Sequence, residues 1–294
     1  MPISRIRTAG RLPGTTWFDS SRAAVMIERV RQGRPLEDIF ILDCHAHIGG
    51  DAQDFTIRDN TPEKILEVMD RMGIDQICIS SMTAIWGDVE RGNEETMAVV
   101  GRYPNRFLGY VVVNPRYPGS LLTELERYRN VPGMQMVKLH PFVHDYPVTG
   151  RKYQPVWEYC QERDVIVLSH TQGADRNCSP LMFDTVARTF PRVTILLGHM
   201  GVTHQGLDEA LEVAAQHDNL YLDITSSFSP FGSIERCVRE VGADRVLFGS
   251  DIPFFEQAVN FGRVAYARIS DADKEKIFGL NMKQLGQRHS STRV

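Results

Sequence analysis

The sequence predicts a single (β/α)8 TIM barrel, a closed sheet of eight parallel strands surrounded by helices. Short apolar runs rich in Val, Ile and Leu recur along the chain, and each is followed by a loop and a helix-like segment. Continuous apolar strands are typical of parallel sheets that are buried on both faces. The alternation extends over about 250 residues, which is the usual size of such a barrel.

The predicted strands are 39–48, 76–82, 107–114, 134–140, 165–171, 193–199, 220–226 and 245–251. Helix starts support the alternation, because Thr61-Pro62 and Ser179-Pro180 each place a capping side chain before a proline at the first helical position. An open, doubly wound sheet is the alternative fold. The sequence lacks the glycine-rich nucleotide-binding motifs of that class, which favours the barrel.

The sequence divides into an N-terminal extension, residues 1–38, and the barrel, residues 39–294. The extension is polar and weakly patterned, apart from an amphipathic stretch at 23–30. We expect it to pack against the barrel as an addition to one domain.

Charge and cysteine content restrict the expected partners and compartment. The chain has 33 Lys and Arg against 37 Asp and Glu, a net charge of −4, whereas nucleic acids and anionic membranes favour clustered basic residues. We therefore expect a small-molecule substrate, without nucleic acid or membrane as a partner; association into a homo-oligomer stays open. Five cysteines without a C-x-x-C pair, and an N-terminus without an apolar signal segment, predict a cytoplasmic protein.

The first predicted strand ends in His45-Ala46-His47. Residues two apart in a strand point to the same face, so both imidazoles project side by side. Two neutral imidazoles are half of a site for a divalent metal, most often zinc. By the same alternation Asp43 would share their face, and Cys44 would point outward toward a helix.

Later strands also end in polar residues. Lys138 and His140 close the fourth strand, and the fifth, sixth and eighth end at His170, His199 and Asp251. The carboxyl ends of all strands meet at one mouth of a barrel, where active sites of this fold lie. We therefore expect these side chains to converge.

These residues resemble the amidohydrolase superfamily. The elements His45-Ala46-His47, Lys138, His170, Gly198-His199-Met200-Gly201 and Ser250-Asp251-Ile252-Pro253 are similar to its amidohydrolase-2 branch, which includes relatives of amino-carboxymuconate-semialdehyde decarboxylase. The resemblance covers residues 39–290. It implies one divalent ion held by His45, His47, His170 and Asp251.

The resemblance leaves two roles open. His199 matches a histidine that either polarises the reacting group or binds a second metal. Lys138 corresponds to a lysine that is carbamylated and bridges two metals in binuclear relatives; the alternative, which we favour, is a cation for a substrate carboxylate. His140 shares the face of Lys138 and is a candidate for the same second metal or for substrate.

Two reactions use the same residues. A metal lowers the pKa of bound water, so hydrolysis of an amide, ester or lactone is the first expectation, with Asp251 and His199 as catalytic groups. Non-oxidative decarboxylation or hydration of a small carboxylic acid, aromatic or not, is the alternative. A TatD-like nuclease and a non-catalytic binding subunit rank lower. Candidate substrate-binding residues are Trp86, Arg116 and Arg176 in loops and Asp223 at the end of the seventh strand.

Overall fold

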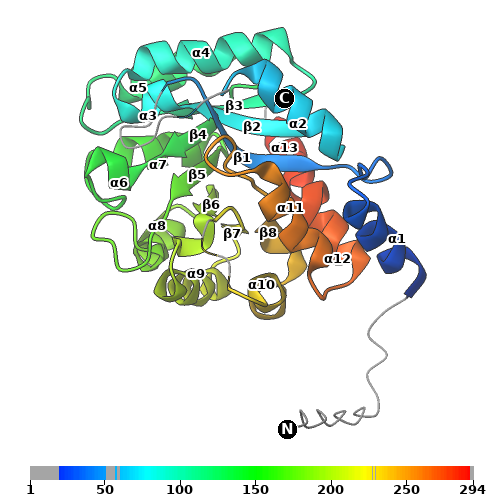
Figure 1. Cartoon of the computed structure of the whole chain (residues 1–294). Helices are drawn as coiled ribbons and strands as arrows, with labels where there is room; N and C mark the ends of the chain where they lie inside the picture. Colours follow the sequence, from blue (N-terminus) through cyan, green and yellow to red (C-terminus); the bar gives the residue numbers. More distant parts are fainter. Residues whose placement is uncertain (1–19, 51–56, 58–59, 227, 229, 292–294) are drawn as a thin grey trace, which may run out of the picture.

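The chain folds as a (β/α)8 barrel, as the sequence predicts. In a computed structural model, which describes residues 20–50, 57, 60–226, 228 and 230–291, eight parallel strands neighbour one another in sequence order from β1 to β8. Helices surround this sheet on its outer side (Figure 1). The strands are β1 (Leu42–Ile48), β2 (Gln76–Ser81), β3 (Phe107–Val112), β4 (Met136–Leu139), β5 (Ile166–His170), β6 (Thr194–Gly198), β7 (Leu220–Asp223) and β8 (Val246–Leu247).

Each strand lies within the range predicted for it, and helices alternate with the strands. In the described part of the chain the helices are α1 (Ser20–Arg31), α2 (Pro62–Met72), α3 (Met82–Trp86), α4 (Val89–Arg102), α5 (Leu121–Tyr128), α6 (Pro141–His144), α7 (Gln154–Glu162), α8 (Phe183–Thr189), α9 (His204–Gln216), α10 (Ser233–Val241), α11 (Gln257–Tyr266), α12 (Asp271–Glu275) and α13 (Asn281–Ser291). Single helical turns lie at η1 (Pro180–Met182), η2 (His199–Gly201), η3 (Ala243–Arg245) and η4 (Lys276–Leu280).

The proline-marked helix starts are present. Thr61 caps α2 by accepting a hydrogen bond from the backbone nitrogen of Lys64, and α2 ends at Gly73, whose positive φ of 77° terminates the helix. Ser179 likewise caps η1, which leads into α8. These local signals place the helices between successive strands.

The barrel closes between its first and last strands. Because β8 is short, closure relies on the backbone that follows it: Cys44 N donates to Phe248 O at 2.9 Å, Asp251 N donates to His45 O at 2.8 Å, and His47 N donates to Ile252 O at 2.8 Å. These bonds bring Asp251 beside the two histidines of β1.

Apolar side chains fill two layers. The larger layer lies between strands and helices and includes Ile79, Val137, Ile195 and Phe278. The smaller layer comes from strand residues that face the barrel interior, with Met282 and Leu285 of α13 packed against them; its strand residues include Leu42, Cys44, Cys78, Tyr110, Leu168 and Leu196. The interior of the barrel below the mouth is therefore a packed core.

A β-bulge in β1 corrects the predicted orientation of Asp43 and Cys44. Asp43 pairs with Ile77 and Ala46 with Ile79, so β1 has one residue more than β2 over this step. Cys44 consequently packs in the interior layer instead of pointing outward. Asp43 bonds to the Gln257 side chain of α11 at 2.7 Å and to the backbone nitrogen of His45 at 3.1 Å, away from the imidazole rings.

The N-terminal extension is described only from residue 20, so residues 1–19 lie outside the described part and the domain boundary at 38 stays a prediction. Helix α1 packs against α11, and Met26 joins the larger apolar layer. Among the described residues, none of the helices combines the length and the apolar character needed to cross a bilayer.

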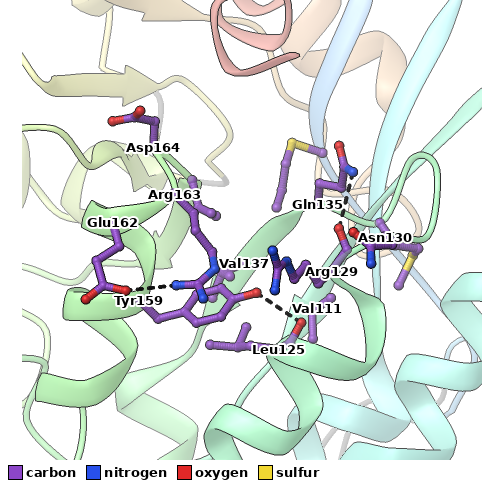
Figure 2. A pocket seen from close by; sticks show the side chains of 13 residues that line it. Val111, Leu125, Arg129, Asn130, Gln135, Val137, Tyr159, Glu162, Arg163 and Asp164 are labelled. Carbon is purple, nitrogen blue, oxygen red and sulfur yellow. Dashed lines mark hydrogen bonds and ion pairs between the residues drawn. The ribbon is translucent and has the colours of Figure 1, made fainter. Parts of the chain in front are cut away.

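One cavity of about 330 Å³ lies at residues that precede β4 and β5, beside α5 and α7 (Figure 2). The charged side chains of its lining form ion pairs, either with one another or with neighbouring residues. Arg163 bonds to Glu162 at 3.0 Å and to Glu126 at 3.2 Å, and its guanidinium lies 4.1 Å from the centroid of the Tyr159 ring. The cavity shares no residue with the histidine-rich mouth.

Asp43→Asn is expected to remove part of the pH dependence of stability. Burial raises the pKa of Asp43 to about 7, against hydrogen bonds from Ser250, Gln257 and the His45 backbone that favour the charged form. Between about pH 4 and pH 7 the folded chain holds a proton that the unfolded chain has lost. The free energy of unfolding therefore falls as the pH rises through this range, by about 1.4 kcal/mol per pKa unit.

Asparagine stays neutral, and Gln257 Oε1, which has no partner among the described residues, can accept from its amide. Urea unfolding of metal-free protein from pH 4 to pH 8 measures the difference. The slope should be smaller in Asp43→Asn than in the wild type, whereas the control Asp218→Asn, at a fully exposed side chain, should keep the wild-type slope. Parallel curves for all three proteins would contradict the prediction.

Candidate active site

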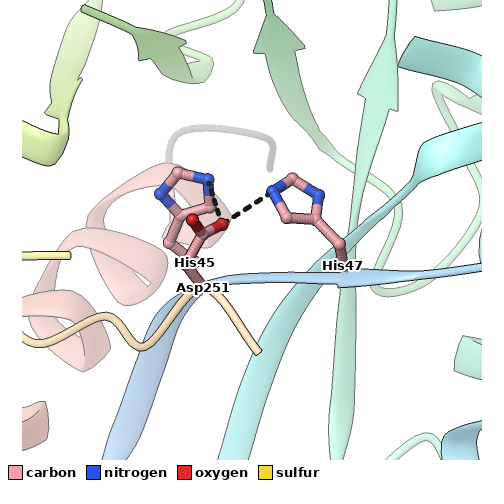
Figure 3. Close-up of side chains that lie close together, drawn as sticks. All are labelled: His45, His47 and Asp251. Atoms are coloured by element: carbon pink, nitrogen blue, oxygen red, sulfur yellow. Dashed lines mark ion pairs between the residues drawn. The ribbon is translucent and has the colours of Figure 1, made fainter. Parts of the chain in front are cut away.

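Two histidines of β1 and the aspartate that follows β8 form a buried cluster. The ligand atoms of His45, His47 and Asp251 all lie within 4.8 Å of one another. Asp251 Oδ1 is 3.1 Å from His47 Nε2 and 3.8 Å from His45 Nε2 (Figure 3). Two imidazoles and a carboxylate that converge in this way can hold a divalent ion.

Asp223 orients the ring of His45. Its Oδ2 lies 2.6 Å from His45 Nδ1, and both side chains are fully buried. The Nδ1–H donates to the carboxylate, which leaves the Nε2 lone pair for a metal. Asp223 is itself held by the Thr225 backbone nitrogen at 2.9 Å and the Thr225 hydroxyl at 2.5 Å.

Gly249 allows this close approach. A Cβ at position 249 would lie 2.5 Å from Asp223 Oδ1 and 3.1 Å from the Cβ of His45, too close for any larger residue. Its place in Gly249-Ser250-Asp251 is therefore structural, and sequence reasoning did not single it out.

His47 is oriented by a hydroxyl. Ser80, at the end of β2, lies with its Oγ 3.0 Å from His47 Nδ1, while Nε2 faces Asp251. Burial lowers the pKa of His47, although Asp251 opposes this shift. Both histidines of β1 are thus neutral, and the Nε2 atoms of both rings, which could bind a metal, are directed at one point. Ser80 was also missed, and its position at a strand end was the available signal.

Asp251 is ionised and has a strained backbone. Burial would raise its pKa, but the close contact with His47 and the nearby His199 and Lys138 outweigh burial and hold the pKa below its ordinary value. Its φ of 64° is left-handed, as are those of His199 (68°) and Val202 (60°). Such conformations cost about 1–3 kcal/mol each and gather at functional sites.

Lys138 lies beneath the cluster. It is fully buried, and its Nζ donates to His45 Nε2 at 2.7 Å. Burial lowers the pKa of Lys138 to about 8. The lone pair of His45 Nε2 serves one partner at a time, so a metal bound there would displace the Lys138 contact.

His170 and His199 complete a group of rings beside the cluster. The His199 ring centroid is 4.8 Å from that of His45 and 4.8 Å from that of His170. His199 Nδ1 donates to the Thr225 carbonyl at 3.1 Å. Neither ring nitrogen of His170 has a hydrogen-bond partner among the described residues, although both are buried.

The unpartnered nitrogens of His170 bear on whether the residues suit a metal. Burying polar atoms without partners is costly, and a metal bound to one nitrogen of His170 would give that nitrogen a partner. The nitrogen and oxygen donors of His45, His47 and Asp251 match common divalent sites. The described residues therefore fit a metal ion, with His170 adjoining the cluster rather than within the closest group of three.

A pocket of about 320 Å³ opens above the cluster. One part of its lining is polar: His47, His140, His170, Gln172, His199 and Asp251. The other part is mainly apolar and includes four aromatic side chains: Trp86, Phe142, Phe254 and Phe255. The pocket can thus accept a small molecule with a flat apolar body and one polar end.

The structure separates the predicted substrate-binding residues. Trp86 lines the pocket. Arg116 and Arg176 do not belong to its described lining; Arg176 bonds to Asp145 at 2.7 Å, and Arg116 donates to the His144 carbonyl at 2.7 Å. Asp223 lies behind His45 and acts through that ring. Phe254 and Phe255 were not predicted, because their approach depends on the turn after Asp251.

The family model described as Amidohydrolase matches residues 42–284. A gamma-resorcylate decarboxylase from Polaromonas sp. strain JS666 is 24% identical over 287 residues, covering 76% of this chain and 86% of that protein.

Solved structures share the fold. A 2,6-dihydroxybenzoate decarboxylase from Rhizobium has a TM-score of 0.70 at 18% identity, covering 85% of this chain and 99% of that chain. A dihydroxybenzoic acid decarboxylase from Polaromonas sp. JS666, solved with bound manganese and the inhibitor 2-nitroresorcinol, has a TM-score of 0.67 at 19% identity, covering 87% and 98%.

Asp223→Asn is expected to weaken metal binding by about 10- to 100-fold, the usual effect of losing the carboxylate behind a metal-binding histidine. The variant keeps an acceptor for His45 Nδ1 but removes the charge that makes Nε2 a strong donor. Asp43→Asn is the matched control, because Asp43 bonds to the backbone of His45 and not to its ring. Competition with a metal chelator measures both affinities, and equal affinities in the two variants would refute this role of Asp223.

Proposed function

The chain belongs to the amidohydrolase family, and we propose that it is a metal-dependent decarboxylase of a small aromatic carboxylic acid. The observation that carries the proposal is the pocket, which brings four aromatic side chains together with His47 and Asp251 of the buried cluster; the Phe254 ring lies with its centroid 5.6 Å from that of His47. An aromatic ring packs favourably against such a wall, while its carboxylate and any neighbouring hydroxyl face the cluster.

The names of the relatives favour decarboxylation over hydrolysis. The sequence alone made hydrolysis the first expectation and decarboxylation the alternative, since both use the same residues. The similar proteins are decarboxylases of dihydroxybenzoic acids. Their names support the alternative, and the four aromatic side chains of the pocket are consistent with it.

We propose that His45, His47 and Asp251 hold one divalent ion, with His170 as a further ligand. The similar Polaromonas enzyme contains manganese, so manganese is to be tested beside zinc, the ion expected from the sequence. When bound, such an ion supplies positive charge that attracts and polarises substrate oxygens. The buried carboxylate of Asp223 keeps His45 in the tautomer that this role requires.

The residues around the pocket account for the proton that the reaction needs. Loss of carbon dioxide leaves the bonding electron pair on a ring carbon, which must receive one proton. Asp251 is ionised, lines the pocket and can take a proton from a substrate hydroxyl or from water and return it to that carbon. Its left-handed backbone is bonded to His45 O through Asp251 N at 2.8 Å, which holds the carboxylate at the pocket.

His199 has a supporting role. Its Nδ1–H donates to the Thr225 carbonyl, so Nε2 is the nitrogen available to the pocket. It can accept a hydrogen bond from a substrate hydroxyl and so orient the ring relative to Asp251. The apolar wall around Phe254 excludes water from the reacting carbon.

The metal-loaded protein is expected to release carbon dioxide from 2,6-dihydroxybenzoate, and Asp251→Asn is expected to lower kcat by about 10²–10⁴-fold, the usual contribution of general acid–base catalysis. Asparagine keeps an oxygen for the metal but cannot carry the proton. Metal in excess separates lost occupancy from lost proton transfer. Resorcinol formation by chromatography is the measurement.

Asp218→Asn is the control for the substitution, because that side chain is exposed and remote from the pocket. The wild-type protein could fail to decarboxylate several ring-substituted hydroxybenzoates and yet hydrolyse a lactone or an ester. That pair of results would return the assignment to hydrolysis. Near-normal kcat in Asp251→Asn would leave His199 as the proton carrier.

Lys138→Met is expected to retain the metal. The Lys138 ammonium donates to His45 Nε2, the atom that the metal would use. Replacing the lysine removes a competitor for this nitrogen and a positive charge that repels the metal. Elemental analysis of wild type and variant, purified with equal metal, measures occupancy. A variant without metal would contradict this expectation and indicate a carbamylated lysine that binds the ion.

A further inference from the structure

His140, which directly follows β4, has a ring nitrogen whose proton position is determined by a helix. The side chain caps α6, and its Nδ1 accepts a hydrogen bond from the backbone nitrogen of Val143 at 3.3 Å. An accepting Nδ1 carries no proton, so the neutral ring carries its proton on Nε2. No residue in the described part of the chain accepts a hydrogen bond from this Nε2–H.

The ring of His140 is also fixed in direction. It stacks on His170 with ring centroids 4.3 Å apart and planes inclined by 12°. The edge of His170 in turn faces His199. His140 lines the pocket together with Phe142 and Val143 of α6. Stacking and capping together hold the ring without using Nε2.

Several other donors around the site are already engaged, although Trp86 Nε1 and the ring nitrogens of His170 also have no partner among the described residues. Lys138 Nζ donates to His45 Nε2, and His199 Nδ1 donates to the Thr225 carbonyl. His47 Nδ1 is hydrogen-bonded to the Ser80 hydroxyl. His144, which is also in α6 and is buried, donates from Nε2 to the Ile85 carbonyl at 3.1 Å, and its Nδ1 lies 3.3 Å from the Tyr153 hydroxyl. Like the N–H of His170, the Nε2–H of His140 has no protein acceptor among the described residues, whereas the N–H groups of His199 and His144 bond to backbone carbonyls.

We propose that His140 is a substrate-positioning residue that donates from Nε2 to an oxygen of the group that decarboxylation removes. This assignment rests on the proposed function and identifies how the same pocket distinguishes an acid from its decarboxylated product. A substrate carboxylate has an oxygen to accept this bond, and the product ring has none. Binding of the acid is thereby favoured over retention of the product.

The test uses ligands that the metal-loaded protein does not turn over. The probe is 2-nitroresorcinol, whose nitro group has the shape of a carboxylate, and resorcinol is the matched ligand without that group. Calorimetry measures Kd for the wild type, His140→Phe and His140→Asn. Phenylalanine keeps the stack on His170 and removes the donor; asparagine can cap α6 through its oxygen and still donate from its amide.

For His140→Phe we expect 2-nitroresorcinol to bind about 3- to 10-fold more weakly, as for the loss of one neutral hydrogen bond, with less than about 2-fold change for resorcinol. His140→Asn should recover most of the affinity. His217→Phe, at a histidine that contacts Asp184 and not the pocket, should bind both ligands as the wild type does.

Three results would overturn the assignment. Unchanged binding of 2-nitroresorcinol to His140→Phe would exclude the hydrogen bond. Equal losses for both ligands would show that the ring acts only as part of the wall. Binding of neither ligand by the wild type would overturn the proposed substrate class and this assignment with it, whereas tight binding without carbon dioxide release would overturn the reaction alone.

Discussion

The site depends on the hydrogen bonds that close the barrel. Backbone bonds join β1 to the chain after β8, and they place Asp251 against His45 and His47 although these residues are about two hundred positions apart in sequence. The short β8 makes this closure depend on the turn that carries Asp251. Since a backbone contact holds both sides of the cluster, the ligand geometry belongs to the scaffold instead of to mobile loops.

Burial then determines the chemistry of the cluster. The rings of His45, His47 and His170 all have lowered pKa values, chiefly because burial disfavours their charged forms. Asp251 remains ionised because positively polarised neighbours outweigh its burial. The site therefore presents neutral imidazoles and one anionic carboxylate at neutral pH, which is the donor set that a divalent cation prefers.

Much of the fold could be predicted from sequence, because strands, helix caps and the converging strand ends are local patterns. The eight strands and the His45-Ala46-His47 face followed from such patterns. The inward turn of Cys44 did not, since a bulge adds one residue and breaks the alternation on which the prediction relied. Arg116 and Arg176 could not be placed either, because their partners near Asp145 are set by how three loops meet.

The packed core below the mouth has a consequence for transport. Among the described residues, interior side chains such as Leu168 and Leu196 pack with Leu285 of α13 in one buried cluster that fills the barrel below the pocket. In the proposed decarboxylation, the substrate, the carbon dioxide and the ring product would therefore all use the pocket at the carboxyl ends of the strands. Carbon dioxide is smaller than the ring and uncharged, so it is expected to leave before the ring product does, and the reverse reaction would then depend on the concentration of dissolved carbon dioxide.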